Sequence, residues 1–433
     1  MTPEASRWYY SNKGSKTGGV DDDQAWGVRD DGGGAVMLVD LHGHFPMHLL
    51  EDEQQQTHKR LNAWFRHRWQ SLVVDLISHF ANYQGPGDTP SVTEQLMRAG
   101  DVGVTLSVLY QAFDEIDLTQ EYAAPPRESY FADVVDQLQT VEDYASAPGR
   151  DVVVAHSSGE LGQLLSAANP KPILVHAVEG GFHVGKDRDE VRANVRTLAD
   201  RGVAYITVAH LFFRQVATNA PALPFLPDVI YNRVFPQEAS EGLTALGREL
   251  VEAMIDEGIL VDLTHMRSQS IRDVFALLDA RDPAKEIPVI ATHMAYRFGG
   301  LEYSFDDDTV RRVAARGGLL GLIMCQHYIS SGLSDVKENF EGSVDAVCRH
   351  IDKIHELTGS YDHIGIGSDL DGYIKPALPG LEHQGRMADL QQALSDRYGA
   401  GVAQRIAGDN ALRMLRTQWG RKRPRPASVG AGV

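Results

Sequence analysis

The chain has 433 residues, with 59 acidic and 41 basic side chains and a formal net charge of −18. Such an acidic chain repels phosphate backbones and anionic lipid headgroups, which argues against nucleic acid or a membrane surface as its main partner. A hydrophobic content of 43% supports a large core and suits either two ordinary domains or one large barrel.

The two cysteines, Cys325 and Cys348, cannot form a disulfide framework in a chain of this size, which fits a reducing compartment. No apolar signal segment, 18-residue apolar run or hydrophobic anchor tail is visible. We therefore expect a cytoplasmic protein. Residues 1–35 are expected to be an N-terminal extension that is flexible or forms an interface, and residues 417–433 a disordered basic tail.

Residues 36–45 form a short apolar run that contains His42-Gly43-His44 and predicts the first strand of the domain. Side chains two positions apart point to the same side of a strand, so His42 and His44 are expected to lie side by side. Two adjacent imidazoles are half of a metal site, although an ordinary polar strand end has the same pattern. The other ligands have to come from elsewhere in the chain.

A covering helix is expected within residues 49–83, where large apolar side chains recur at helical spacing, and another at residues 93–99. Seven further strands are predicted at residues 103–110, 173–178, 204–209, 259–264, 288–292, 319–323 and 363–368, with a minor edge strand at 152–155. Strands that alternate with helices pair in parallel, and eight such units close into a ring. The sequence therefore predicts an α/β fold, a (β/α)8 TIM-type barrel with helical insertions, over residues 36–416.

Six of the eight predicted strands end in histidine, glutamate or aspartate. The residues concerned are His42, His44, Glu179, His210, His265, His293 and Asp369. Each alone also fits a buried core histidine, a helix cap or a solvated carboxylate. A barrel, however, brings the carboxyl ends of its strands to one rim, where imidazoles and carboxylates can bind one or two divalent cations. Burying these groups without a cation would cost several kcal/mol, so together they predict a metal centre.

The segments that carry these residues are similar to a known family. Residues 178–181, 259–265, 288–293 and 364–372 together resemble the renal (membrane) dipeptidase family of zinc peptidases, a branch of the amidohydrolase-type barrels. The resemblance covers about residues 36–415. Its most specific parts are Glu-Gly-Gly at 179–181 and Gly-Ile-Gly-Ser-Asp at 365–369.

The resemblance implies a centre with two divalent metal ions, zinc first and manganese or iron as alternatives. The implied ligands are His42, His44 and Asp369 for one ion, His265 and His293 for the other, and Glu179 as a bridge between them. His210 matches the histidine that polarises the scissile carbonyl, and Asp369 would pass a proton to the leaving amine. The implied reaction is hydrolysis of the amide bond of a dipeptide or related small molecule by a metal-bridging hydroxide.

Three features depart from the family pattern. His44 stands where the family has an aspartate, which removes a negative charge from around the first ion. Tyr303 occupies the place of the arginine that binds the substrate carboxylate, and Arg297 is the nearest substitute for it. The segment 211–238 is long and aromatic, so it is expected to form an apolar wall over the site, a packed excursion or a subunit contact.

Two alternatives stay open. The histidine-rich ligand set also suits an iron-dependent, non-hydrolytic enzyme that performs an oxidative or decarboxylating step. A barrel used only for binding or assembly is the second alternative, which the full set of strand-end ligands disfavours. The expected partner is a small-molecule or dipeptide substrate, with neither nucleic acid nor membrane, and the sequence is compatible with a homo-oligomer.

Overall fold

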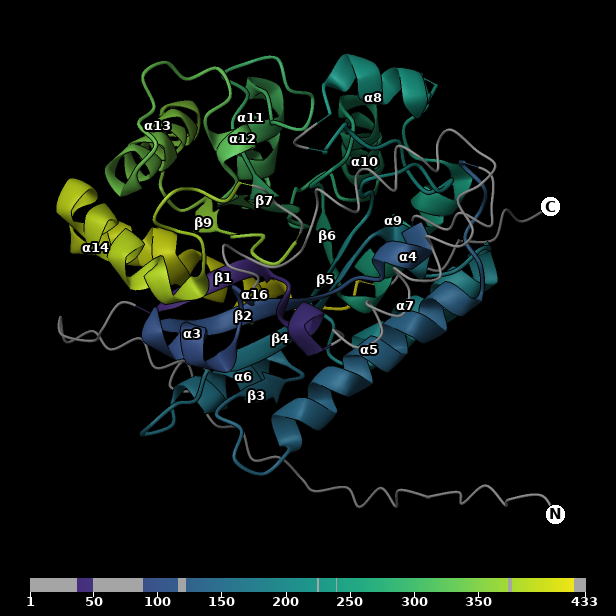
Figure 1. The fold of residues 1–433 in the computed structure, drawn as a ribbon. Helices are drawn as coiled ribbons and strands as arrows, with labels where there is room; N and C mark the ends of the chain where they lie inside the picture. The colour runs from purple at the N-terminus through teal and green to yellow at the C-terminus, as the bar shows by residue number, and fades with distance from the viewer. Residues whose placement is uncertain are drawn as a thin grey trace, which may run out of the picture.

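Eight parallel strands form the centre of the molecule. The structure is a computed structural model that describes residues 37–49, 89–115, 122–223, 226–238, 240–372 and 376–423. The strands of the ring are β1 (Leu38–Gly43), β2 (Val102–Leu109), β4 (Ile173–Glu179), β5 (Tyr205–Thr207), β6 (Leu260–Asp262), β7 (Ile290–Met294), β8 (Leu319–Leu322) and β9 (Ile364–Ile366). Because β1 pairs with both β2 and β9, and β2 pairs with β4, the sheet closes on itself. This ring confirms the predicted (β/α)8 barrel (Figure 1).

A short additional strand, β3 (Val153–Ala155), is the minor strand expected at residues 152–155. It pairs with the first half of β4, whereas β5 pairs with the last two residues of β4 on the same edge. The other edge of β4 pairs with β2. β3 is therefore an addition to the ring of eight.

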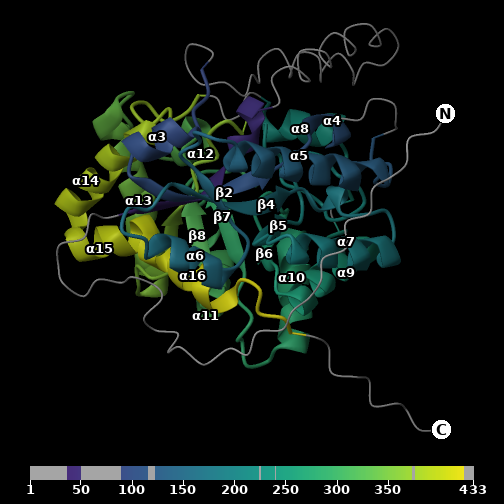
Figure 2. The same ribbon diagram turned by 90° about the horizontal axis from the view of Figure 1, so that it is seen from below.

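Helices surround the ring on its outside (Figures 1 and 2). They are α3 (Glu94–Ala99), α4 (Ala112–Glu115), α5 (Ser129–Ser146), α6 (Ser158–Leu165), α7 (Arg188–Asp200), α8 (Asp228–Val234), α9 (Ala245–Glu257), α10 (Ser268–Arg281), α11 (Asp307–Ala315), α12 (Gln326–Ile329), α13 (Phe340–Thr358), α14 (Met387–Tyr398), α15 (Ala400–Gln404) and α16 (Asn410–Gln418). The short helices α4, α8 and α12 lie in the connections that follow β2, β5 and β8. Two 3-10 helices, η2 (Phe45–Leu49) and η3 (Gly181–His183), likewise follow the carboxyl ends of β1 and β4.

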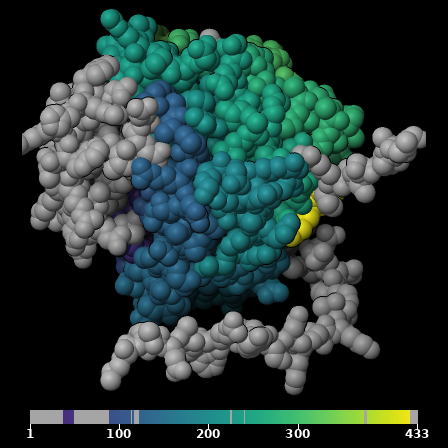
Figure 3. Space-filling model, turned by 90° about the vertical axis from the view of Figure 1, so that its right-hand side faces the viewer, coloured from purple at the N-terminus to yellow at the C-terminus, as the bar shows by residue number. Residues whose placement is uncertain are grey.

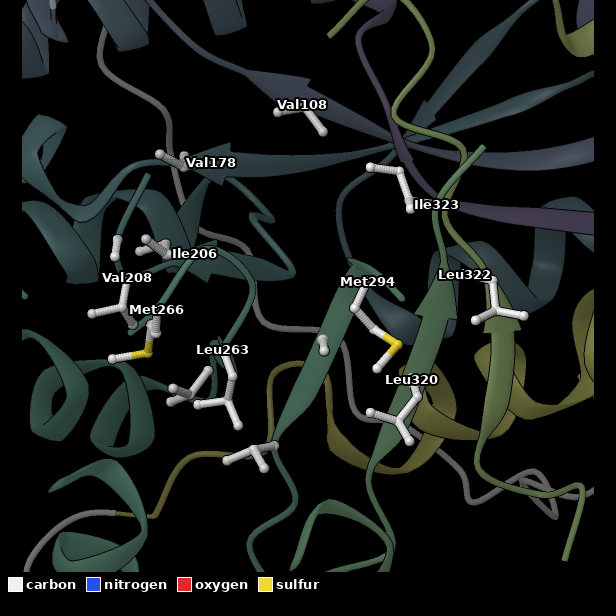
Figure 4. Packing of buried hydrophobic residues seen from close by; sticks show 14 of the residues in the cluster. Val108, Val178, Ile206, Val208, Leu263, Met266, Met294, Leu320, Leu322 and Ile323 are labelled. Carbon is white, nitrogen blue, oxygen red and sulfur yellow. The ribbon is translucent and has the colours of Figure 1, made fainter. Parts of the chain in front are cut away.

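The strands are buried on both sides. Along β4, Val175 and Ala177 belong to the cluster inside the barrel, whereas Leu174 and Val178 belong to the cluster that packs under the helices. Figure 4 shows part of this outer cluster, including Val178. Two-sided burial explains why the strands read as continuous apolar runs rather than as alternating patterns.

The C-terminal boundary differs from the prediction at residue 416. Helix α16 continues to Gln418, and Trp419 beyond it is buried. The N–H of Gly420 then donates to the carbonyl of Gly258, next to the end of α9. Residues 417–423 are therefore part of the fold, because a buried tryptophan and backbone hydrogen bonds hold them against the barrel.

Several expectations fall outside the described residues. These are the N-terminal extension at 1–35, the covering helix from residue 50 to 83 and the tail from 424 to 433. Within the described ranges, no helix is both long enough and apolar enough to cross a lipid bilayer.

Candidate metal centre

Seven polar side chains meet at the carboxyl rim of the barrel. They are His42, His44, Glu179, His210, His265, His293 and Asp369, and all are buried. They end or follow β1, β4, β5, β6, β7 and β9. The structure thus brings together every metal-ligand and catalytic candidate named from the sequence, while their roles stay predictions.

The first group of ligand atoms comes from β1 and β9. Nε2 of His42 and Nε2 of His44 are 3.2 Å apart, so the two imidazoles lie side by side. Nε2 of His44 is 3.2 Å from Oδ1 of Asp369. These three residues form one cluster able to hold a metal ion.

Glu179 lies between this first group and a second one. Its Oε1 is 3.3 Å from Nε2 of His42 and 3.5 Å from Nε2 of both His265 and His293. The latter two nitrogens are 2.9 Å apart. Glu179 therefore has the position that a carboxylate bridging two ions would need.

The charge states suit cation binding. Burial raises the pKa of Glu179, but the positive charges of His210 and His42, together with hydrogen bonding to nearby imidazoles, outweigh burial and hold that pKa well below its ordinary value. Burial lowers the pKa values of His265 and His293, so both rings are neutral and have a lone pair to offer. Among the described residues, Oε1 of Glu179 has no hydrogen-bond partner although it is buried. Such an orphaned acceptor beside the neutral imidazoles of His265 and His293 fits a divalent cation with nitrogen and oxygen ligands.

A hydroxyl group orients the ring of His42. The Tyr205 hydroxyl donates to the carbonyl of Leu41 and lies 2.8 Å from Nδ1 of His42. Because the hydroxyl hydrogen points to the Leu41 carbonyl, the hydroxyl oxygen can only accept a hydrogen bond from Nδ1–H of His42. With its hydrogen on Nδ1, the ring has the lone pair of Nε2 available for a metal.

Asp262 organises the threonines behind the centre. Its Oδ1 accepts from the backbone N–H of Thr264 and of Thr292, and its Oδ2 accepts from the Thr292 hydroxyl at 2.7 Å. That hydroxyl lies 3.0 Å from Nδ1 of His293. The buried carboxylate thereby fixes a group that positions a candidate ligand.

Two candidate ligands have an unusual backbone conformation. His265 has φ of 65° and Asp369 has φ of 56°, in the left-handed region that costs non-glycine residues about 1–3 kcal/mol. The N–H of Asp369 donates to the carbonyl of His42 at 2.8 Å, which helps to hold this turn. The chain therefore bends sharply at the rim where these side chains are needed.

Asp40 joins the first strand to the last one. Its Oδ1 accepts from the N–H of Ser368 and its Oδ2 from the Ser368 hydroxyl, at 2.8 and 2.6 Å. Oδ1 also accepts from the N–H of His42 at 3.2 Å. This buried carboxylate locks the end of β1, with His42, against the residue that precedes Asp369.

Glu115 is a site residue that the sequence analysis missed. Its Oε2 lies 2.6 Å from Nδ1 of His210 and accepts from the Tyr110 hydroxyl at 2.8 Å. Nε2 of His210 faces the centre, 3.3 Å from Oε2 of Glu179. Burial lowers the pKa of His210, but the carboxylates of Glu115 and Glu179 outweigh it and raise that pKa to about 9. The signal in the sequence was weak because Glu115 follows β2 by several residues, on the short helix α4.

The two candidates for substrate binding are both engaged with backbone carbonyls. The guanidinium of Arg297 donates to the carbonyls of Ser304 and Glu302, at 2.7 and 2.9 Å. The hydroxyl of buried Tyr303 donates to the carbonyl of His293 at 2.6 Å, and its ring lies against His265. Tyr303 is thus next to the centre, whereas Arg297 braces the segment that carries Tyr303.

The long segment 211–238 packs partly on itself and partly on the main core. A small separate cluster is formed by Phe212, Leu223, Tyr231, Val234 and Phe235, whereas the main cluster includes Val216, Ala217, Ala220 and Ala222. The N–H of Phe212 donates to Oε1 of Glu115, which links the segment to the His210 pair. Pro224 and Phe225, which the sequence analysis included in the apolar wall, lie outside the described residues.

The fold and this centre define a metallohydrolase built on a (β/α)8 barrel. The sequence model of the family described as "Membrane dipeptidase (Peptidase family M19)" matches residues 35–426. The chain belongs to this family of metallopeptidases, and the predicted resemblance is confirmed. It is accordingly a metallo-dipeptidase-type hydrolase, and its family implies divalent metal ions.

Two curated relatives come from Schizosaccharomyces pombe, and both are named uncharacterized dipeptidases. One is 27% identical over 323 residues, which are 74% of this chain and 70% of the relative. The other is 29% identical over 227 residues, which are 52% of this chain and 48% of the relative.

Solved structures share the fold. A metallopeptidase called dipeptidase AC has a TM-score of 0.65 at 18% identity, covering 89% of this chain and 100% of its own. A metallopeptidase from Rhodobacter sphaeroides, solved with a phosphinate mimic of the dipeptide L-Ala-D-Ala, has a TM-score of 0.62 at 19% identity, covering 89% and 99%.

Proposed function

We propose that this chain hydrolyses the amide bond of a dipeptide or a related small molecule with two divalent metal ions, zinc being the first choice. The observation that supports this most is the position of Glu179, whose carboxylate lies between the His42 group and the His265–His293 pair. Imidazole and carboxylate ligands of this kind suit zinc, with manganese and iron as alternatives.

The ligands divide into two sets. His42, His44 and Asp369, which lie close enough together to share an ion, would hold one ion. His265 and His293 would hold the other, and Glu179, which is near both sets, would contribute to each. When bound, such ions lower the pKa of an attacking water toward neutrality and polarise the carbonyl of the substrate.

The protein's own groups would then move protons and orient the substrate. Asp369, at the rim beside His44, would accept a proton from the attacking water and return it to the leaving amine. His210, held at Nδ1 by Glu115, would donate from Nε2 to the oxygen of the scissile carbonyl. Tyr303, packed against His265, would form part of the substrate wall.

The first substrates to test are dipeptides with a C-terminal D-residue, because the Rhodobacter sphaeroides relative binds a mimic of L-Ala-D-Ala. The full chain would be stripped with a chelator and reloaded with zinc, manganese or iron. It would then be assayed against L,L- and L,D-dipeptides and N-acyl amino acids. We expect hydrolysis that is lost on chelation and restored by metal.

Two variants test the site itself. His265→Ala removes a proposed ligand, and Asp369→Asn removes both a ligand charge and the proton acceptor, so each should lower kcat by at least about 100-fold. His363→Gln, a half-buried histidine that bonds the Gly318 carbonyl at the far ends of the strands, is the matched control. Oxygen uptake by the iron form, without hydrolysis by any form, would instead support the oxidative alternative.

A further inference from the structure

A second group of metal-ligating side chains lies on the outside of the barrel. Glu142 on α5, His156 directly after β3 and His176 on β4 each place one ligand atom within 4.8 Å of the others. Along β4, Ala177 faces the barrel interior and Val178 faces the helices. Because side chains alternate along a strand, Glu179 shares the inward face of Ala177 and His176 shares the outward face of Val178. His176 therefore points away from the rim centre, toward the layer of helices.

His176 is the most unusual member of this group. It is fully buried, and neither ring nitrogen has a hydrogen-bond partner within the described part of the chain. Its Nε2 is 3.5 Å from Oε1 of Glu142, which is long for a hydrogen bond. Buried imidazole nitrogens nearly always have a hydrogen-bond partner. Nε2 of His176 is therefore unusual, because it faces the carboxylate of Glu142 without forming a hydrogen bond to it.

Neighbouring side chains hold His156 and Glu142 in place. Nδ1 of His156 lies 3.3 Å from Oε2 of Glu160, and Nε2 of His156 lies 3.2 Å from Oε1 of Glu142. Oε2 of Glu142 accepts from Arg201 at 2.8 Å. A carboxylate behind a histidine and a donor behind a carboxylate are the supports that metal ligands commonly have.

The charges around this group favour a cation. Glu142 and Glu160 are acidic and Arg201 is basic, so the fixed groups carry a net negative charge. Oε1 of Glu142, the oxygen that Arg201 does not hold, faces both imidazoles. With 44% of its side chain exposed, His156 lets an ion and a completing water reach the group from solvent. In Figure 3 the blue surface of the segment that includes α5 borders the teal surface of later residues.

We propose that Glu142, His156 and His176 form a second, separate site for a divalent transition-metal ion of the zinc type. Two imidazoles and one carboxylate are a known zinc ligand set, with water as the fourth ligand. The ion would clamp α5 and the β3–α6 connection to the outer face of β4. The clamp reaches the rim indirectly, because Gln137 of α5 exchanges hydrogen bonds with the backbone of Tyr110.

The test compares zinc binding by four full-length chains: wild type, His156→Gln, Glu142→Gln and the control His363→Gln. Each is stripped by chelation, equilibrated with Zn2+ and analysed for bound metal per chain by mass spectrometry. We expect wild type and His363→Gln to bind one more Zn2+ than His156→Gln and Glu142→Gln. Because His156 is partly exposed, its replacement leaves the core intact.

The thermal midpoint gives a second measurement that does not depend on enzyme activity. Saturating Zn2+ should raise the midpoint of wild type and His363→Gln by more than that of His156→Gln and Glu142→Gln, because only the first two have the outer site. Equal numbers of bound Zn2+ in all four chains would overturn the proposal.

Discussion

Oε2 of Glu115 lies 2.6 Å from Nδ1 of His210, while Nε2 of the same ring faces Glu179 at 3.3 Å. His210 thus lies between the carboxylate of Glu115 and the candidate metal centre. A cation bound by Glu179 would offset the charge of that carboxylate but not that of Glu115. Glu115 therefore keeps a hydrogen on His210, the residue that we propose faces the substrate.

Glu115→Gln should lower kcat/KM by about 10–100-fold, since partners that orient a site histidine typically contribute that much. The glutamine keeps the shape but removes the anionic acceptor, so the pKa of His210 falls from about 9 and the alkaline limb of the pH–rate profile moves to lower pH. Exposed Glu128, which pairs with Lys186, gives the control Glu128→Gln. A wild-type profile in Glu115→Gln would show that His210 does not depend on this carboxylate.

His44→Asp should change the metal preference. The substitution introduces the carboxylate that the family resemblance implies at this place and adds a negative charge beside Asp369. Carboxylates favour harder cations, so the affinity for manganese should rise relative to that for zinc. Competition titrations of the stripped chains would measure the ratio. An unchanged ratio would mean that His44 does not ligate the metal.

Arg297→Ala should raise KM about 10–100-fold with little change in kcat if this arginine binds the carboxylate of a substrate, the range that a charge-assisted hydrogen bond supports. In the structure its guanidinium holds the carbonyls of Ser304 and Glu302, so binding a substrate would require it to leave them. Arg311→Ala, at an exposed ion pair on α11, is the control. An unchanged KM would remove Arg297 from the site.

His350 should make stability depend on pH. Its Nδ1 accepts from the N–H of Tyr296 and its Nε2 lies 2.8 Å from the Ile329 carbonyl. Burial lowers its pKa to about 4, whereas the unfolded chain has a value near 6.5. The unfolded state therefore takes up a proton first as the pH falls, so the stability present above pH 6.5 is progressively lost down to pH 4. The loss from this group reaches about 2 kcal/mol at pH 5.

The measurement is the free energy of unfolding of wild type and His350→Gln between pH 7.5 and 4.5, in a chain freed of metal. The variant loses some stability at every pH, but the slope of its free energy of unfolding against pH should be smaller than that of wild type. The difference corresponds to up to one proton fewer taken up on unfolding. Parallel curves would mean that His350 does not set this slope.

The meeting of these side chains at one rim could be predicted from the sequence, because strand-end residues of a parallel barrel converge whatever the details of the helices. Their roles stay predictions. The apolar runs before Glu179, His265 and Asp369 were enough to place these residues. The same reasoning does not reach Glu115, because this residue lies on α4, several residues beyond the end of β2. Its carboxylate is placed by contacts with a distant segment, the N–H of Phe212 and the ring of His210.

Other features depend on tertiary contacts that no local pattern reveals. The left-handed backbone of His265 and Asp369 follows from the turns around them, and neither is a residue type that demands such a turn. Arg297 looked available from the sequence, yet its hydrogen bonds are to carbonyls of its own loop. Residues 417–423 looked like a tail because their basic composition outweighed the single buried Trp419.

The bond between Asp40 and Ser368 joins the first strand of the ring to the last one. The two residues are 328 positions apart in the sequence. The side chains proposed to hold the first ion therefore come together only when the ring has closed, so metal binding at this rim would report that the whole barrel has folded.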